Sequence, residues 1–263
     1  MSTEAGGLTS SEYISHHITN WAVSLDGSEG GFMTVNVDSI VMGWITAAIL
    51  VALGMWLGRR LTVGVPSGVQ NFMESVVEFV ENSVKDSFPG RNSLVAPLAL
   101  TVFAWIFLMN ITKLLPIDLV PSIAHALGAP YWRTTATTDL NTTLGIALTV
   151  FILVIYTNIK VKGIGFFKEF LYHPFGKYLM PFNIIMKAIE EIAKPLSLAL
   201  RLFGNMFAGE LVFLLIALFP FYMQFIPGVL WSGFELLVVV LQAFVFMILT
   251  IVYLAMASTE EEH

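Results

Sequence analysis

Residues 229–256 read VLWSGFELLVVVLQAFVFMILTIVYLAM, and Glu235 is their only charged side chain. At 1.5 Å per residue, a continuous helix over this stretch is roughly 42 Å long. The hydrocarbon core of a bilayer is only about 30 Å thick. The stretch therefore predicts a membrane-spanning helix that is tilted or bent.

Four further apolar runs are long enough to cross a bilayer: residues 37–57, 94–115, 140–159 and 196–218. Hydrocarbon offers backbone groups no hydrogen-bond partners, so spanning segments are helices or closed barrels. These runs lack the alternation of barrel strands. We predict an all-α polytopic membrane protein with five membrane helices.

The last two membrane helices are predicted to form a long, strongly tilted hairpin. Helical character extends over residues 183–219, which corresponds to roughly 55 Å of continuous helix. Pro195 lies inside this segment and is a suitable place for a bend. Residues 220–228 carry no charge and are predicted to form the turn of the hairpin.

Composition argues against several classes of function. Hydrophobic residues make up 56% of the chain and charged residues 12%, against about a quarter in soluble domains. The chain has no cysteine, and its histidines lack metal-ligand spacing: His16, His17, His125, His173 and His263. It also lacks a GxxxxGK[ST] phosphate loop. We expect no metal, no cofactor, no nucleic-acid partner and no catalytic residue in this chain.

Basic residues alternate between the predicted connections, which sets the orientation. The segment before the first span has none, the next connection is basic, and the alternation continues to residues 220–228, which have none. We expect a single domain with an outer N-terminal tail (1–36), a membrane domain (37–256) and an inner C-terminal tail (257–263). The opening residues lack the basic and apolar regions of a signal peptide and are expected to remain on the chain.

Residues 69–86 follow a different pattern, with apolar side chains recurring at helical spacing among Glu74, Glu78, Glu81 and Lys85. This pattern predicts an amphipathic helix at the inner membrane surface. Such a helix either docks a peripheral partner or caps the bundle, and the sequence leaves both open.

Arg201 lies within an apolar run, LALRLFGNMFAGE at residues 198–210. An arginine at the centre of a membrane helix costs about 2.5–3.5 kcal/mol on insertion scales. Glu210 is nine residues away and falls on the opposite helix face, so the two cannot pair within one straight helix. Arg201 is expected to be buried and to need a partner from elsewhere.

Polar and small residues share the Arg201 face, namely Ser197, Asn205 and Gly209. Small residues let another helix approach closely. That helix either belongs to this subunit or is a carboxylate-bearing helix of another chain, which the central arginine favours.

On the last predicted helix, Glu235 and Gln242 are seven residues apart and share a face. Burial disfavours ionised carboxylates, so Glu210 and Glu235 are either neutral and inert or part of a hydrated proton path. Near the outer ends of the second and third spans, further polar residues gather: Asn110, Lys113, Asp118, Asp139 and Asn141. These are candidates for lining an outer channel, as is Ser197 on the arginine face.

Three segments resemble subunit a of the rotary F-type ATP synthase, the membrane-sector stator, in its proteobacterial form: PLSLALRLFGNM at 195–206, LQAFVF at 241–246 and LLPID at 114–118. The resemblance implies that Arg201 faces the carboxylates of a ring of subunit c, with Asn205 and Gln242 as polar neighbours. It places Glu210 and Glu235 at half-channel positions. Some relatives have glutamate at the first of these positions and histidine at the second, whereas this chain has glutamate at both. One relative has an acidic residue at the position of Lys113.

The resemblance further implies two offset proton half-channels that meet the ring at different places, a peripheral-stalk subunit b as partner, and a location in the bacterial inner membrane. The N-terminus is then periplasmic and the C-terminus cytoplasmic, and ATP is made elsewhere in the complex. A sodium-coupled version of the same subunit is one alternative. A secondary ion transporter is another, although the sequence shows no paired repeats.

Overall fold

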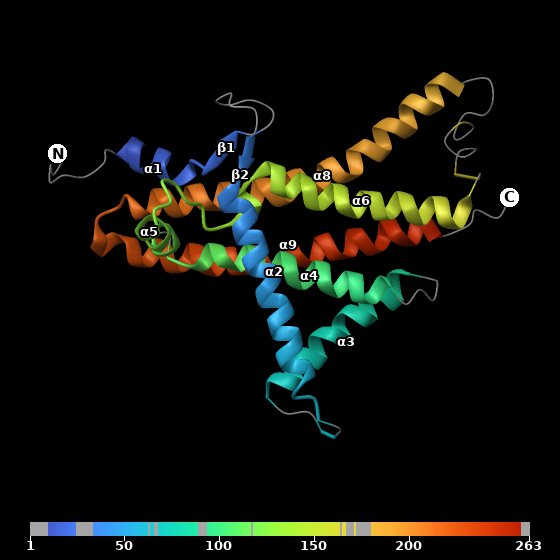
Figure 1. Ribbon diagram of the computed structural model, residues 1–263, viewed down its shortest axis with the longest axis horizontal. Helices are drawn as coiled ribbons and strands as arrows, with labels where there is room; N and C mark the ends of the chain where they lie inside the picture. The colour runs from blue at the N-terminus through green and yellow to red at the C-terminus, as the bar shows by residue number, and fades with distance from the viewer. Residues whose placement is uncertain are drawn as a thin grey trace. The chain divides into compact units, whose positions relative to one another are not determined.

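A computed structural model describes residues 10–24, 34–62, 64–65, 68–88, 94–116, 118–163, 165–166, 171 and 180–258. His173, His263 and the predicted inner tail from residue 259 onward lie outside this range. The described chain is almost entirely helical (Figure 1). Its helices and strands are α1 (Ser10–Ile18), β1 (Ala22–Ser24), β2 (Thr34–Asn36), α2 (Val37–Gly58), α3 (Val69–Ser87), α4 (Val95–Ile111), η1 (Thr112–Leu114), α5 (Leu119–Ala126), η2 (Ala136–Thr138), α6 (Leu140–Lys162), α8 (Met180–Ala217) and α9 (Phe221–Ser258).

Five of these helices are long and apolar enough to cross a membrane, which confirms the predicted fold class. They are α2, α4 continued by η1, α6, α8 and α9. Helices α2, α4 and α6 begin and end near the predicted apolar runs, because backbone groups in hydrocarbon must be satisfied within the segment. Helices α8 and α9 begin well before the predicted runs at 196–218 and 229–256. The chain is a multi-pass membrane protein.

The predicted turn of the last hairpin is wrong in extent. Helix α8 ends at Ala217 and α9 begins at Phe221, so most of residues 220–228 are helical and Pro227 lies inside α9. Gln224 Nε2 donates to the carbonyl oxygens of Ala217 at 2.9 Å and Phe219 at 2.7 Å. This side chain satisfies carbonyls that the end of α8 leaves without helical partners, so a short turn is sufficient. Each helix has 38 residues, or about 57 Å at 1.5 Å per residue.

The described chain divides into two compact units. The first unit comprises Met1–Leu50, Phe107–Thr142 and Phe203–Val240, and the second comprises Val51–Ile106, Thr143–Leu202 and Leu241–His263. Both units contain parts of α8 and α9.

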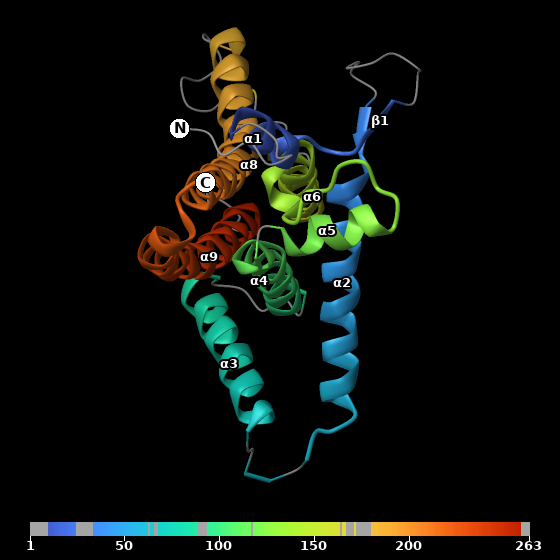
Figure 2. The same ribbon diagram turned by 90° about the vertical axis from the view of Figure 1, so that its left-hand side faces the viewer.

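In the first unit, the polar N-terminal segment has structure that hydropathy did not indicate. Helix α1 precedes a two-stranded antiparallel sheet in which Ala22 pairs with Asn36, and β2 continues directly into α2 (Figure 2). The short helix α5 lies between η1 and η2 in sequence. These short elements supply polar side chains to the ends of the membrane helices in this unit.

In the second unit, the predicted amphipathic helix is confirmed as α3. Its Val80 is buried, and the ring of Phe79 lies 6.3 Å from that of Phe103 on α4 and 5.6 Å from that of Phe244 on α9. Phe72 remains exposed. In Figure 1 the second-unit parts of α4, α6 and α9 run in roughly the same direction. Helix α3 therefore covers this bundle with one face and leaves the other uncovered.

Candidate functional site

Two glutamates are buried in the first unit, Glu210 on α8 and Glu235 on α9. Each meets a cation from the segment that joins α4 to α6, namely Lys113 for Glu235 and Arg133 for Glu210. Charged side chains in a membrane protein are expensive to bury without a partner. The structure therefore places a cation against each of these carboxylates.

The Lys113–Glu235 pair is the more buried of the two. Lys113 Nζ lies 2.8 Å from Glu235 Oε2, and both side chains are 2% exposed. The same ammonium group donates to the backbone carbonyl oxygen of Asn205 at 3.4 Å. Lys113 is in η1, where the tighter 3₁₀ turn ends the second membrane helix. One lysine thus connects three elements of the first unit: η1, α8 and α9.

Arg133 holds Glu210 and also fixes the N-terminal segment. Its Nη2 donates to Glu210 Oε2, and its Nη1 donates to Asn20 Oδ1 at 3.0 Å. Its backbone amide donates to Asp38 Oδ2 at 3.2 Å, and its guanidinium carbon lies 5.7 Å from the ring centroid of Phe207. The planar guanidinium group suits this use because it presents five donors in fixed directions.

Gly209 lies next to the Lys113–Glu235 pair. A Cβ atom at this position would collide with the Glu235 carboxylate and with Lys113 Nζ. The backbone carbonyl of Gly209 accepts a hydrogen bond from Trp231 Nε1 at 3.4 Å. A side chain at position 209 would therefore require the Glu235 carboxylate and the Lys113 ammonium group to move.

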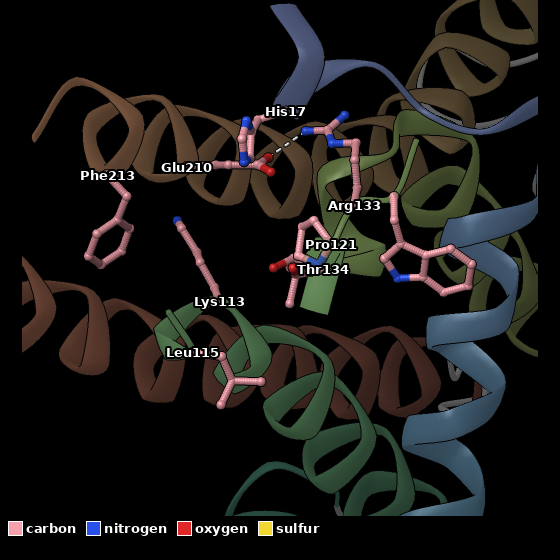
Figure 3. A pocket seen from close by; sticks show the side chains of 10 residues that line it. His17, Lys113, Leu115, Pro121, Arg133, Thr134, Glu210 and Phe213 are labelled. Carbon is pink, nitrogen blue, oxygen red and sulfur yellow. Dashed lines mark hydrogen bonds and ion pairs between the residues drawn. The ribbon is translucent and has the colours of Figure 1, made fainter. Parts of the chain in front are cut away.

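A cavity of about 120 Å³ opens beside Glu210 and Arg133. Figure 3 shows the residues that line this cavity and the ion pair between Arg133 and Glu210. The lining is made up of His17, Lys113, Leu115, Pro121, Trp132, Arg133, Thr134, Thr135, Glu210 and Phe213. Trp132 Nε1 and Arg133 Nε are buried and find no hydrogen-bond partner among the described residues. A polar cavity of this size has room for several waters, at about 30 Å³ each in the liquid.

Asp118 lies near this cavity in a cluster with two residues of α1. His17 Nε2 is 2.9 Å from Asp118 Oδ1, and Tyr13 donates its hydroxyl to the same carboxylate at 3.2 Å. Burial, followed by the charge of Asp118 and the hydrogen bond to it, raises the pKa of Tyr13 to about 12. Tyr13 therefore remains a neutral donor at all physiological pH values.

The remaining outer residues predicted for the site lie elsewhere in the first unit. Asn110 is buried and accepts a hydrogen bond from Thr137 Oγ1 at 2.8 Å. Asp139 precedes α6 and accepts from the backbone amide of Asn141 at 3.1 Å and from Thr142 Oγ1 at 3.1 Å, as a helix-capping residue does. Asp139 and Asn141 line a different, wider cavity of about 470 Å³ with residues of β2.

The side chain of Arg201 is exposed on the surface of this chain, so no part of the described chain buries it. Ser197, Gly204 and Asn205 on the same helix face are also exposed. Burial of this face against a helix of another chain, which the central arginine favours, stays a prediction. Among the described residues, no carboxylate pairs with Arg201. Gln242, in contrast, is 3% exposed.

The two ion pairs are not among the predictions from sequence. Lys113 is predicted only as a member of the outer polar cluster, and Arg133 is not among the predicted site residues. A usable signal was present: Glu210, Glu235 and Lys113 lie within apolar runs. Arg133 is the only lysine or arginine between the second and third runs. Long-range pairing followed from the rule that intramembrane charges find partners, but the rule does not say which charge pairs with which.

Comparison with known proteins identifies the family. Residues 40–255 match the family described as ATP synthase A chain. The chain is 52% identical to ATP synthase subunit a of Alkalilimnicola ehrlichii over 259 residues, which cover 98% of this chain and 99% of the relative. It is 51% identical to ATP synthase subunit a 1 of Photobacterium profundum and 49% identical to ATP synthase subunit a of Vibrio parahaemolyticus, in each case over 100% of both chains. The chain therefore belongs to the ATP synthase subunit a family.

Proposed function

We propose that this member of the ATP synthase complex passes protons between two offset half-channels and the carboxylates of a ring of subunit c, so that proton flow turns the ring. The observation that carries the proposal is the state of Arg201. It lies within a helix long enough to cross a membrane, it is exposed, and no described residue of its own chain neutralises it.

A guanidinium at membrane depth is stable only next to water, a carboxylate or another acceptor. The small residues Gly204 and Ala208 are exposed beside Arg201 on α8 and allow a second helix to approach closely. A passing helix with one carboxylate fits both features. Arg201 then favours the ionised carboxylate and blocks direct passage of protons between the half-channels.

Glu210 and Glu235 serve as proton relays in the outer half-channel under this proposal. Each carboxylate is in direct contact with a cation. Glu210 and Lys113 also line the cavity of about 120 Å³. A proton that arrives through cavity water neutralises a carboxylate and weakens its contact with the cation. When the proton moves on, the carboxylate is ionised again and the ion pair forms again. Protons are favoured over sodium because a sodium ion would place a further positive charge beside Lys113 and Arg133.

The cycle begins when a proton from the outer side neutralises a ring carboxylate. The ring turns, and the proton leaves to the inner side when the carboxylate reaches Arg201. The alternation of basic residues supports a periplasmic N-terminus and a cytoplasmic C-terminus in the bacterial inner membrane. The uncovered face of α3, which carries Phe72 and several glutamates, is the proposed contact for peripheral-stalk subunit b.

The test is to replace Arg201 with alanine in the assembled complex and to measure ATP synthesis and passive proton conductance in vesicles. Loss of synthesis together with a proton leak supports the proposal. Normal synthesis with confirmed assembly contradicts it.

A further inference from the structure

We propose that His17 is the proton-uptake residue of the outer half-channel, through which helix α1 connects outside water to the cavity that holds Glu210. The inference rests on the function proposed above. It assigns a role to a side chain outside the membrane helices and outside the motifs of the sequence analysis.

The position of His17 supports this role. Its side chain is 10% exposed and lines the same cavity as Glu210, Lys113 and Arg133. The carboxylate with which it pairs, that of Asp118, is 63% exposed. Figure 3 shows His17 and Glu210 together at one side of the cavity. The His17–Asp118 pair therefore has one member in water and one member at the cavity wall.

The hydrogen bonds of the imidazole ring suit a residue that carries a proton. Nε2 lies 2.9 Å from Asp118 Oδ1, and Nδ1 lies 3.0 Å from the backbone carbonyl oxygen of Tyr13. Both partners are acceptors, so both ring nitrogens donate only when the ring is a doubly protonated imidazolium. Histidine is the side chain that most readily changes charge near neutral pH.

The proton balance of the step is simple. The Nε2–H bond of the imidazolium breaks as its proton passes to a cavity water. Nε2 then takes a proton that outside water delivers through the Asp118 carboxyl group. One proton has moved from outside water to cavity water, and His17 and Asp118 are unchanged.

The other charged and titratable groups around His17 do not replace it. Tyr13, on the same helix, keeps its proton because its pKa is raised to about 12. Lys113, Arg133 and Glu210 face the cavity from η1, from the segment after α5 and from α8, and the two cations there are engaged with carboxylates. Within the described part of the chain, His17 is the histidine that lines this cavity.

The experiment uses the assembled ATP synthase in proteoliposomes, with the potential held constant and the pH on the α1 side varied from about 5 to 8, the range over which histidine changes charge. The rate of ATP synthesis is compared for the unaltered complex, His17→Gln and His125→Gln. His125 is the matched control, because it is an exposed histidine of α5 that does not line the cavity.

His17→Gln is expected to lower the rate about tenfold and to flatten its dependence on outer pH. The loss is smaller than the ~10²-fold contribution of a positioned general acid or base, because water still reaches the cavity directly. His125→Gln is expected to behave like the unaltered complex. Imidazole added on the α1 side is expected to restore the rate of His17→Ala, which a purely structural role of His17 does not predict.

An unchanged pH profile in His17→Gln overturns the proposal, and so does a reduced rate in His17→Ala that imidazole does not restore. Glu210→Gln separates this failure from failure of the proposed function. If Glu210→Gln abolishes proton flux while His17→Gln has no effect, the relay function stands and only the role of His17 falls. If neither has an effect, both proposals fall.

Discussion

Lys113 Nζ lies 2.8 Å from Glu235 Oε2 across 122 residues of sequence, and neither side chain is more than 2% exposed. Desolvating two charges is costly, so this contact need not stabilise the fold more than a pair of apolar side chains would.

The first prediction is that assembly of the complex requires opposite charges at positions 113 and 235. Lys113→Glu or Glu235→Lys alone leaves two like charges buried together and is expected to prevent stable assembly, since breaking a buried pair costs about 3–5 kcal/mol. The double variant with both changes restores opposite charges and is expected to recover assembly and part of the proton pumping. Both are measured in membranes by the amount of assembled complex and by ATP-driven acidification.

A matched control is the exposed pair of Lys85 and Glu81 on α3, whose side chains are 68% and 52% exposed. Lys85→Glu is expected to change stability by no more than about 1 kcal/mol, as is typical of exposed ion pairs. If the double Lys113/Glu235 exchange assembles no better than either single change, the two residues do not act as a pair.

The second prediction concerns Gly209. Gly209→Ala places a methyl group against the Glu235 carboxylate and Lys113 Nζ, so both side chains must shift from the positions in which they pair. Loss of assembled complex or of proton pumping is expected, although alanine in a helix interior is favoured over glycine by about 0.5–1 kcal/mol. Gly145→Ala on α6, where a Cβ meets nothing within 4 Å, is the control and is expected to be neutral or stabilising. Equal behaviour of the two variants would argue against the close contact at Gly209.

The sequence predicted the membrane helices well because their cause is local. Each of the five is an apolar segment whose backbone groups must form their hydrogen bonds within the segment. Composition and length are therefore enough to predict that it is a helix. The amphipathic helix α3 is equally predictable from sequence, because apolar side chains that recur at helical spacing indicate a helix with one buried face. The turn between α8 and α9 was placed wrongly because absence of charge does not distinguish a turn from a helix. Only the hydrogen bonds of Gln224 to the end of α8 show how a short turn closes.

The site was only partly predictable. Glu210 and Glu235 were identified because carboxylates in apolar helices are unusual, but their partners are 77 and 122 residues away in sequence. The periodicity of a helix does not indicate which loop residue, such as Arg133, will pair with one of its side chains. The cluster of His17 with Asp118 depends on the folding of an N-terminal segment whose polar composition resembles that of an unstructured tail.

The third prediction is that Glu210 must exchange protons. Glu210→Gln keeps an oxygen that accepts from Arg133 but cannot gain or lose a proton at neutral pH. ATP-driven proton pumping is expected to fall by about 10²-fold or more, which is the contribution of a positioned acid–base group. Glu78→Gln on the exposed face of α3 is the control. Unchanged pumping in an assembled Glu210→Gln complex would leave the Arg133–Glu210 pair with a structural role only.

The last prediction is that Arg201→Ala uncouples the motor without dismantling it. Arg201 is exposed and makes no ion pair with any described residue, so removing its side chain breaks no ion pair of the described fold. The subunit is therefore expected to assemble. Under the proposed function, the variant loses the cation that favours proton release from a ring carboxylate and that blocks direct passage of protons between the half-channels.

ATP synthesis by Arg201→Ala is expected to be abolished, while passive proton conductance of the membrane sector persists or rises. Lysine is expected to be a poor substitute, because its ammonium group lacks the planar fork and can lose its proton when desolvated. Arg60→Ala, which removes an arginine stacked over Trp56 at the end of α2, is the control for loss of a surface cation and is expected to retain synthesis. The measurements are ATP synthesis and proton leak in vesicles of equal complex content. Synthesis at a normal rate by Arg201→Ala would mean that the uncovered cation on α8 has no part in moving the ring.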